Sequence, residues 1–388
     1  MAYIERSLGG ALVKASRGFP AVLLTGPRQS GKTTLLKRLF QRAAYVLLED
    51  PDVIARVRND PRAFIESLRS PVVLDEIQNA PELFNYVRSR IDAAPNRKGQ
   101  WLLTGSQEAG LMGGVTESMA GRVAVLHLLP LSTLESSKVT LVRGGYPGVI
   151  NRPSAAELWY RSYVQTYLER DVRAVTAIRD LATFRRFLAL LATRAGGILN
   201  KTDLAAPLGV SVPTITEWLN TLEVTGQVLV VRPFHENFGK RLIKSPKIYF
   251  ADSGLACHLL GIRNSAELGR SPFHGALFEG FVAAELAKEQ VNRGGRVELY
   301  YFRDQQGLEV DFVVPSRGGR LLLIEAKASR TVTPSMAQSL LRLAAAVERH
   351  EIDAFVVHGG TTGTGGAGRA LAPGVAALTL PELLAEMA

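Results

Sequence analysis

Residues 26–33 constrain this chain more than any other segment. They read Gly-Pro-Arg-Gln-Ser-Gly-Lys-Thr and lie between an apolar, β-branched run and a leucine-rich helical pattern. Such a loop wraps backbone N–H groups around phosphates, and glycine is needed where φ is positive or a side chain would collide. The helix that begins near Gly31 directs its free N–H groups and its positive dipole end toward the same anion. The sequence therefore predicts a nucleotide-binding loop at a strand-to-helix junction.

Two residues at the end of this loop have specific predicted roles. Lys32 is expected to reach the β- and γ-phosphates of ATP, which makes it a candidate catalytic residue. The hydroxyl of Thr33 is expected to hold Mg²⁺. The residues predicted to bind the nucleotide are Gly26, Pro27, Arg28, Gln29, Ser30, Gly31, Lys32, Thr33 and Thr34.

An acidic pair closes the apolar run that begins at Pro71. Asp75 is expected to hold Mg²⁺ through water, and Glu76 is expected to orient and polarise the attacking water. An acidic pair at a strand end can also be a solvated turn. Its position about 40 residues after a phosphate-binding loop favours the catalytic interpretation.

Two further residues complete the predicted nucleotide site. Thr104 ends the apolar run 101–103, where a hydroxyl can sense the γ-phosphate, although a simple turn explains it equally well. Arg122 precedes another predicted strand and is a candidate nucleotide-binding residue; a structural pair with a carboxylate is the alternative. Because predicted strands alternate with helices, we expect a parallel sheet with its ligands at the carboxyl ends of the strands.

Composition narrows the class of protein. The 388 residues suggest two or three domains, and the single cysteine, Cys257, excludes a disulfide framework and a cysteine zinc site. No apolar run approaches the ~20 residues of a membrane span. No export signal is evident around Glu5 and Arg6, so we expect a cytoplasmic protein with no membrane partner. The formal net charge of +10 favours attraction to nucleic acid.

The middle of the chain reads as a helical lid followed by a winged helix. Trp159, Tyr163 and Tyr167 recur at helical spacing and are expected to pack in a core. Helices are predicted over 181–194, 202–209 and 212–222, with Thr202 as N-cap and Gly209 before the turn, and a strand is predicted over 228–232.

This winged helix offers little chemistry for reading bases. Its candidate recognition helix carries no Arg or Lys, the usual base contacts, and its polar residues are Thr214, Thr216, Glu217 and Asn220. The basic residues lie later, where a wing would follow phosphates: Lys240, Arg241, Lys244 and Lys247. The pattern favours weakly sequence-selective DNA binding, with a purely structural winged helix as the alternative.

A second acidic constellation lies near the carboxyl terminus. Glu325 and Lys327 are two residues apart on a predicted strand and so share one face. Asp311 on the neighbouring strand can meet Glu325, and Glu279 on a preceding helix completes a set of oxygen ligands for Mg²⁺ or Mn²⁺. Asp311, Glu325 and Lys327 are the candidate catalytic residues of this site. A salt bridge from Lys327 to either acid is the non-catalytic alternative.

These motifs resemble known families. The segments GPRQSGKTTL, LDEIQ, LLTGSQ and MAGRV together resemble a prokaryotic family of AAA+ ATPases that carry a nuclease-like carboxyl-terminal domain. The α-β-β-β-α-β order with Asp311 and Glu325-x-Lys327 resembles the PD-(D/E)xK nuclease superfamily. The resemblance implies an ATPase that works at a subunit or partner interface, with Arg122 facing the γ-phosphate.

The expected architecture is α/β with three domains: a P-loop parallel-sheet ATPase domain (1–135), a helical lid and winged helix (136–250), and a nuclease-like α/β domain (251–388). One predicted function is an ATP-driven enzyme that acts on DNA and gates a metal-dependent nuclease. The alternative is an ATP-dependent regulator whose last domain docks DNA or protein and cuts nothing. A homo-oligomer is compatible with both, and the sequence identifies no protein partner.

Overall fold

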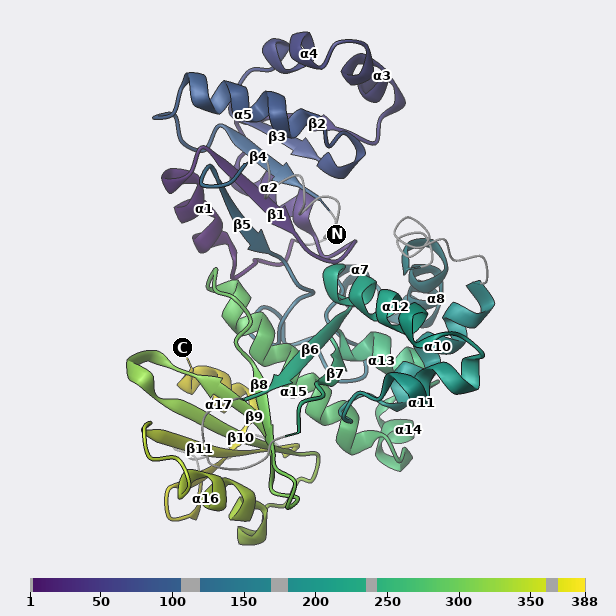
Figure 1. Cartoon of the computed structure of the whole chain (residues 1–388), viewed down its shortest axis with the longest axis vertical. Helices are drawn as coiled ribbons and strands as arrows, with labels where there is room; N and C mark the ends of the chain where they lie inside the picture. Colours follow the sequence, from purple (N-terminus) through teal and green to yellow (C-terminus); the bar gives the residue numbers. More distant parts are fainter. Residues whose placement is uncertain (1–2, 106–118, 169–180, 235–242, 361–368, 388) are drawn as a thin grey trace.

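The computed structural model describes residues 3–105, 119–168, 181–234, 243–360 and 369–387. Three regions are arranged around helix α15 (His274–Asn292), which runs through the centre of the molecule (Figure 1). The amino-terminal sheet lies at the top of the view, the middle helices lie to the right, and the carboxyl-terminal sheet lies at the bottom. The predicted α/β class is confirmed.

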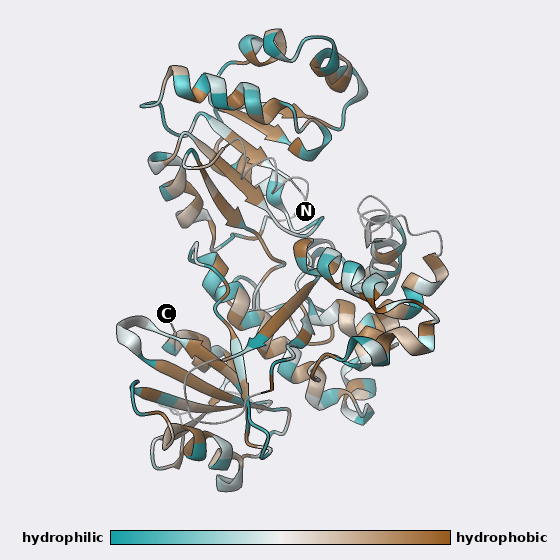
Figure 2. Ribbon diagram, viewed as in Figure 1, coloured by the Kyte–Doolittle hydropathy of each residue, from teal (hydrophilic) through white to brown (hydrophobic). Residues whose placement is uncertain are grey.

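The amino-terminal sheet has five parallel strands in the order β2-β3-β4-β1-β5. Their bounds are β1 Ala21–Thr25, β2 Ala44–Leu47, β3 Val72–Asp75, β4 Trp101–Thr104 and β5 Val123–His127. Every residue of β1, β3 and β4 is buried, as expected of central strands in a parallel sheet with covered faces. Figure 2 shows these strands as the apolar interior of the region.

Helices cover both faces of this sheet. Helices α1 (Gly9–Gly18) and α2 (Lys32–Leu39) share one core with Val22 of β1. Leu23, the next residue, belongs to the opposite core because successive strand residues face opposite sides. The helices of that second face are α3 (Pro51–Asn59), α4 (Pro61–Ser67) and α5 (Leu83–Ala93). The parallel sheet predicted from alternating apolar and helical segments is therefore present.

The middle region is mostly helical. Its helices are α7 (Pro147–Asn151), α8 (Ala156–Tyr163), α10 (Leu181–Thr193), α11 (Lys201–Ala205), α12 (Val212–Val224), α13 (Ser253–Leu259) and α14 (Ser265–Arg270). Trp159 stacks on Tyr163 with ring centroids 4.9 Å apart, which confirms the predicted packing of these two residues. The side chain of Tyr167 and the acidic and basic residues 169–171 lie outside the described part.

The helix–turn–helix segment differs from the prediction at one cap. Thr202 is not the N-cap of α11: the side chain of Asn200 accepts hydrogen bonds from the N–H groups of Thr202 and Asp203. Asn is as good a cap as Thr, and only the local backbone distinguishes them. Gly209 has a φ of 67° before α12, as the predicted turn requires. The roles of lid and winged helix stay predictions.

An eight-stranded sheet spans the middle and carboxyl-terminal regions, in the order β12-β13-β11-β10-β9-β8-β6-β7. Its strands are β6 (Val228–Pro233), β7 (Lys247–Phe250), β8 (Tyr300–Arg303), β9 (Glu309–Pro315), β10 (Leu321–Lys327), β11 (Ile352–His358), β12 (Arg369–Ala372) and β13 (Val375–Thr379). The hairpin β6–β7 joins this sheet where β6 runs parallel to β8. The sheet thus crosses the predicted boundary at 250/251.

Helices also cover both faces of this second sheet. Helix α15 and the last helix, α17 (Leu380–Glu386), pack on one face, and α16 (Gln338–Ala344) packs on the other. No helix in the described part of the chain is both long and apolar enough to cross a membrane.

Buried charges on α15 fasten the carboxyl-terminal region to the end of the amino-terminal one. Glu285 accepts hydrogen bonds from the backbone N–H (2.7 Å) and hydroxyl (2.6 Å) of Thr133. Lys288 donates to Glu285 at 2.8 Å and to the carbonyl of Leu131 at 3.1 Å. Because both charged side chains are almost fully buried, these contacts fix the position of α15.

Candidate functional site

The predicted nucleotide loop connects β1 to α2 in a conformation that requires glycine at two positions. Gly26 has a φ of 136°, and a Cβ built there would lie 2.3 Å from the carbonyl oxygen of Leu128. Gly31 has a φ of 101° and immediately precedes α2. The loop therefore cannot accept side chains at these positions without strain or movement, which agrees with the role predicted for glycine in the sequence analysis.

Lys32 and Ser30 face the interior of this loop. The ammonium of Lys32 donates to the carbonyls of Gly26 (2.9 Å) and Pro27 (3.0 Å) and is 5% exposed. The hydroxyl of Ser30 is fully buried and has no hydrogen-bond partner among the described residues. A buried donor without a partner costs free energy, so this loop fits an anionic ligand such as a nucleotide phosphate.

Three hydroxyl groups contact the carboxylate of Asp75 at the carboxyl end of β3. Thr33 donates to its two oxygens at 3.1 and 2.9 Å, Tyr45 donates at 2.6 Å, and Thr104 makes a short contact with Oδ1. The predicted residues Thr33, Asp75 and Thr104 therefore meet at one point. Their hard oxygen atoms fit Mg²⁺. The roles of these residues in binding stay predictions.

Tyr45 is a residue of this site that the sequence analysis missed. Burial, followed by its hydrogen bond to Asp75, raises the pKa of its hydroxyl. The hydroxyl therefore stays protonated and donates. The parallel pairing of Leu47 with Asp75 could have indicated that β2 lies beside the acid, but nothing in the local pattern singles out Tyr45.

Glu76 adopts a left-handed backbone, with a φ of 59° and a ψ of 51°. Its N–H donates to the hydroxyl of Thr104 at 3.1 Å, and its carboxylate accepts from the amide of Gln78. Non-glycine residues rarely take this conformation, and it turns the chain directly after the strand. The half-buried carboxylate of Glu76 is thereby placed beside Asp75 at the sheet edge.

Arg6 braces the loop from outside the motif. Its guanidinium donates to the carbonyl of Ser30 at 2.7 Å, to the carbonyl of Leu129 at 2.6 Å and to Glu135 at 2.9 Å. Both charged side chains of the pair are buried. The sequence analysis used Arg6 only to argue against an export signal, because its partners lie far away in the chain.

A hydrogen bond joins the nucleotide loop to the middle region. The hydroxyl of Tyr163 donates to the carbonyl of Arg28 at 3.4 Å. It accepts from the side-chain amide of Gln227 at 2.9 Å. Gln227 immediately precedes β6, so a short chain of contacts links the nucleotide loop to the hairpin β6–β7.

The structure contradicts a role for Arg122 at the nucleotide of its own chain. Arg122 precedes β5 and its carbonyl accepts from the N–H of Ala21, so it lies at the amino ends of the strands. The loop lies at the other end, roughly 15 Å away for a strand of this length. Its guanidinium makes a two-pronged ion pair with Asp92, at 2.6 and 3.1 Å. This is the structural alternative. A contribution across a subunit interface stays a prediction.

The acids predicted for the carboxyl-terminal site lie on neighbouring strands, as the register shows. The antiparallel register pairs Ile324 with Phe312, one residue before Glu325 and one after Asp311. Asp311 accepts from the N–H of Ala326 at 2.9 Å. Lys327 donates to Oε1 of Glu325 at 2.5 Å, which is one of the two predicted salt bridges.

Lys247 lies among the acids, a position that the sequence analysis did not predict. Its ammonium lies 2.9 Å from Glu279, 2.7 Å from Glu309 and 3.6 Å from Asp311. Lys247 is 2% exposed, so the predicted contact of this residue with DNA phosphates is wrong. Lys244 is exposed as predicted, whereas Lys240 and Arg241 lie outside the described residues.

The buried acids hold protons more tightly than usual. Burial, and then the negative charge of Asp311, raises the pKa of Glu279 and of Glu325 to about 7. Burial also raises the pKa of Asp311. Burial lowers the pKa of Lys247, but the carboxylates around it raise that pKa further, so it stays charged. The negative charge is therefore only partly compensated.

The fit of this cluster to a metal ion is partial. Oε2 of Glu325 is buried without a hydrogen-bond partner among the described residues. The carboxylates of the cluster offer the hard oxygen ligands that Mg²⁺ and Mn²⁺ prefer. Yet within the described ranges no three His, Cys, Asp or Glu side chains converge closely enough to hold a metal ion. The ammonium of Lys247 already bonds to two of the three predicted ligands, Glu279 and Asp311.

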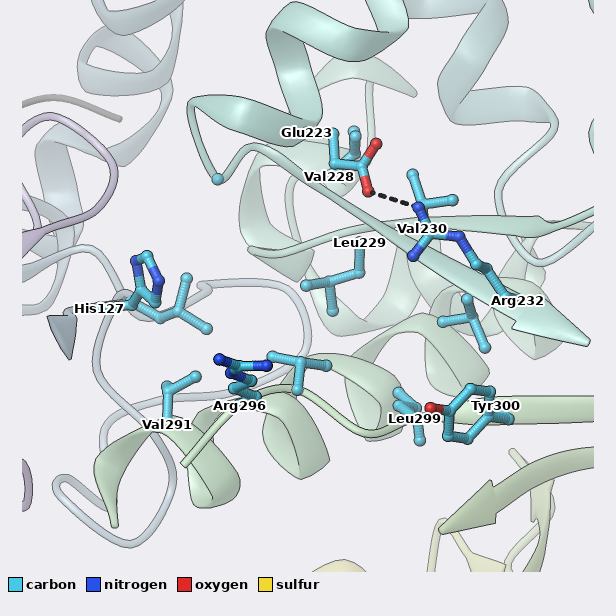
Figure 3. A pocket seen from close by; sticks show the side chains of 14 residues that line it. His127, Glu223, Val228, Leu229, Val230, Arg232, Val291, Arg296, Leu299 and Tyr300 are labelled. Carbon is cyan, nitrogen blue, oxygen red and sulfur yellow. Dashed lines mark ion pairs between the residues drawn. The ribbon is translucent and has the colours of Figure 1, made fainter. Parts of the chain in front are cut away.

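A separate pocket of about 310 Å³ lies where the three regions meet (Figure 3). His127 enters from the amino-terminal region, Leu229 from β6 and Leu299 from the segment before β8. Arg232 pairs with Glu223 across 3.7 Å at its rim. The walls are mainly apolar, and the pocket contains neither the nucleotide loop nor the acid cluster.

Comparison with known proteins identifies an AAA domain. Residues 18–137 match the family described as AAA domain, and residues 134–266 and 274–378 match two domains of unknown function, DUF8612 and DUF4143. The uncharacterized proteins Rv2008c of Mycobacterium tuberculosis and Mb2031c of Mycobacterium bovis are each 35% identical over 345 residues. That alignment covers 87% of this chain and 76% of theirs.

Solved structures are more distant. The Walker-type ATPase PABY2304 of Pyrococcus abyssi is 16% identical with a TM-score of 0.46, covering 66% of this chain and 96% of that one. The AMPPCP-bound DnaA of Aquifex aeolicus is 12% identical with a TM-score of 0.28, covering 56% of this chain and 85% of that one.

Proposed function

This chain belongs to the same family as the two mycobacterial proteins and carries an AAA-type ATPase domain, and on that premise we propose that it hydrolyses ATP with Mg²⁺ and acts on DNA. One observation carries the ATPase part: Thr33 and Thr104 contact Asp75 beside a glycine loop in which Lys32 bonds to the loop carbonyls and the hydroxyl of Ser30 is buried without a partner among the described residues. The remaining parts of the proposal are finer, and each has its own support.

In this proposal, different residues of the nucleotide site bind the phosphates, hold the metal ion and polarise the water. Lys32 and the N–H groups at the start of α2 would bind the β- and γ-phosphates. Thr33 and Asp75 would hold Mg²⁺, which lowers the charge on those phosphates when bound. The carboxylate of Glu76 would accept a hydrogen bond from the attacking water and polarise it.

Substitution of Lys32 tests this assignment of the loop. In Lys32→Ala, the cation that faces the phosphates is lost, and ATP binding is expected to fall below detection in a titration with a fluorescent ATP analogue. The control is Lys37→Ala, later on the same helix, whose ammonium stacks on the ring of Tyr45. If Lys32→Ala binds as tightly as the parent protein, the loop is not the nucleotide site.

The DNA part of the proposal is supported by charge and surface. The net charge is +10, and Lys244 lies exposed in the segment that leads into β7. Helix α12 exposes Glu217 and Asn220 and offers no cation, so contacts to phosphates are favoured over base reading.

The nuclease-like part is supported by Asp311 and Glu325 on neighbouring strands with Lys327 beside them. In this proposal the acids bind Mg²⁺ or Mn²⁺, and Lys327 positions the nucleophile. The second candidate, a regulator that docks DNA or protein without cutting, is favoured by Lys247, whose ammonium already forms ion pairs with Glu279 and Asp311.

A plasmid assay separates these two candidates. Supercoiled plasmid is incubated with the protein and Mg²⁺ or Mn²⁺, with and without ATP, beside an Asp311→Asn variant. Nicking by the parent and not by the variant supports the nuclease. Mobility-shifted but intact plasmid in both reactions supports the regulator.

A further inference from the structure

Lys247 is a cation that one part of the chain inserts into the acid cluster of another. It is the first residue of β7, whereas its partners Glu279 and Asp311 belong to α15 and β9. Its ammonium also lies 5.5 Å from the ring centre of Tyr301, on β8. Three other elements therefore surround this charged group, and its burial leaves water little access to it.

In the acid cluster, the carboxylates outnumber the cations that pair with them. Its carboxylates are Glu279, Glu309, Asp311 and Glu325, and the cations bonded to them are Lys247, Lys327 and Arg303. One negative charge is thus uncompensated when all groups are ionised. Oε2 of Glu325 is also buried and has no hydrogen-bond partner among the described residues.

We propose that Lys247 and a divalent metal ion compete for Glu279 and Asp311, so that β7 controls whether the acid cluster holds metal. This inference rests on the metal site of the proposed function. It adds the residue that closes that site and the strand that carries it.

Competition follows from distance and charge. An ammonium and a divalent ion that share the same carboxylates would lie within a few ångströms of each other, and like charges at that separation repel strongly in a buried site. Lys247 donates to Oε1 of Glu279 at 2.9 Å and forms an ion pair with Oδ1 of Asp311 at 3.6 Å. In this arrangement of the described residues, the acids do not converge closely enough to hold a metal ion.

The hairpin gives this competition a link to the rest of the molecule. Strand β7 pairs with β6 through four residue pairs, including Val231 with Lys247. Gln227, just before β6, bonds to Tyr163, which contacts the nucleotide loop at Arg28. The hairpin that carries Lys247 is therefore connected to the nucleotide loop through Gln227 and Tyr163.

Metal affinity of the full-length, nucleotide-free protein tests the proposal. Mn²⁺ binding is measured by calorimetric titration of the parent, Lys247→Met and the double variant Lys247→Met/Asp311→Asn. We expect Lys247→Met to bind Mn²⁺ at least about tenfold more tightly than the parent, since the competing charge is gone. The double variant should lose this binding, which assigns it to the acid cluster.

Lys288→Met is the matched control, because Lys288 is equally buried and equally paired with a carboxylate on α15. Both lysine variants should melt at a lower temperature in chelator, but Mn²⁺ should restore only Lys247→Met. An Asp311-dependent Mn²⁺ site with equal affinity in parent and Lys247→Met overturns the competition and leaves the proposed metal site intact. No Asp311-dependent Mn²⁺ binding in either protein overturns both, while ATP hydrolysis is unaffected.

Amine labelling provides a second test that needs no variant. The parent protein is treated with an acetylating N-hydroxysuccinimide ester in chelator and in Mn²⁺, and modified lysines are mapped by mass spectrometry. We expect Mn²⁺ to increase the labelling of Lys247 severalfold, because displacement exposes its amine, while Lys288 stays protected in both conditions. Protection of Lys247 at saturating, Asp311-dependent Mn²⁺ contradicts the proposal.

Discussion

Single residues far from the nucleotide motif determine how its loop is held. Arg6 fixes the carbonyl of Ser30 and pairs with Glu135, and the exposed fractions of the two side chains are 4% and 1%. When one partner of a buried ion pair is removed, the other remains as an uncompensated charge. The stability of the loop is therefore expected to depend on Arg6.

Arg6→Met tests this dependence. Removal of the guanidinium should lower the free energy of unfolding by about 3 kcal/mol and weaken ATP binding, since Glu135 is left buried and unpaired. Urea denaturation measures the first effect. Arg122→Met removes an Arg–carboxylate pair that is exposed, and it should leave stability nearly unchanged. Equal losses in the two variants would contradict a special role for Arg6.

Because His127 is buried, we expect it to make the stability of the protein depend on pH. Burial lowers the pKa of its imidazole, whose Nδ1 lies 2.6 Å from the hydroxyl of Thr25. Below pH about 6.5 the unfolded chain binds a proton that the folded protein does not. The contribution of His127 is therefore complete above that pH and is lost as the pH falls below it.

His127→Gln checks the sign of this effect. The variant keeps a polar group near Thr25 but cannot titrate, so its melting temperature should fall less than that of the parent between pH 7.5 and 5.5. Parallel melting curves across this range would show that His127 does not contribute.

The sequence predicted the nucleotide residues because that motif is local. Residues 26–34 and the pair Asp75–Glu76 follow from spacing along the chain alone. Tyr45, Arg6 and Lys247 were missed because their partners are 24 to 129 residues away, and nothing nearby in the sequence marks them. For Arg122, the structure shows the structural pair that was the alternative, because the motif did not reveal which end of the strand the residue occupies.

At the scale of elements, the sequence patterns predicted which segments form strands and helices, but they did not predict which strands pair. The helix predicted over 212–222 is present as Val212–Val224, and the strand predicted over 228–232 is present as Val228–Pro233. Strands β12 and β13 were not anticipated, because both are short and only a short turn separates them. The parallel pairing of β6 with β8 joins distant segments, and no periodicity within either strand predicts it.

At the segment before β7, we expect DNA binding through phosphate contacts. Lys240, Arg241 and Lys244 carry the predicted phosphate contacts, now without Lys247. Replacement of all three by Gln should lower DNA affinity evenly across sequences and reduce the salt slope by up to about one unit per lost contact. Lys98→Gln, on an exposed loop of the other region, is the control. A change in sequence preference with an unchanged salt slope would refute phosphate binding by this segment.

At the scale of the whole molecule, the middle and carboxyl-terminal regions are one structural unit. The shared sheet, Lys247 and the buried groups of α15 cross the sequence boundary that we predicted at 250/251. A fragment of residues 130–388 should unfold in a single transition. A fragment of residues 130–250 should lack a cooperative transition, because β6 and β7 lose β8 and the acids that pair with Lys247. A stable, cooperative 130–250 fragment would contradict this unit.

The central claim is that the chain turns over ATP at the edge of its parallel sheet, with Glu76 polarising water. The most direct measurement compares Mg²⁺-dependent phosphate release and ATP binding in the parent and in Glu76→Gln. The amide keeps the size of the side chain and cannot polarise water in the same way, so we predict unchanged binding and a loss of turnover of at least about 100-fold. Phosphate release by Glu76→Gln at the parent rate would contradict the account.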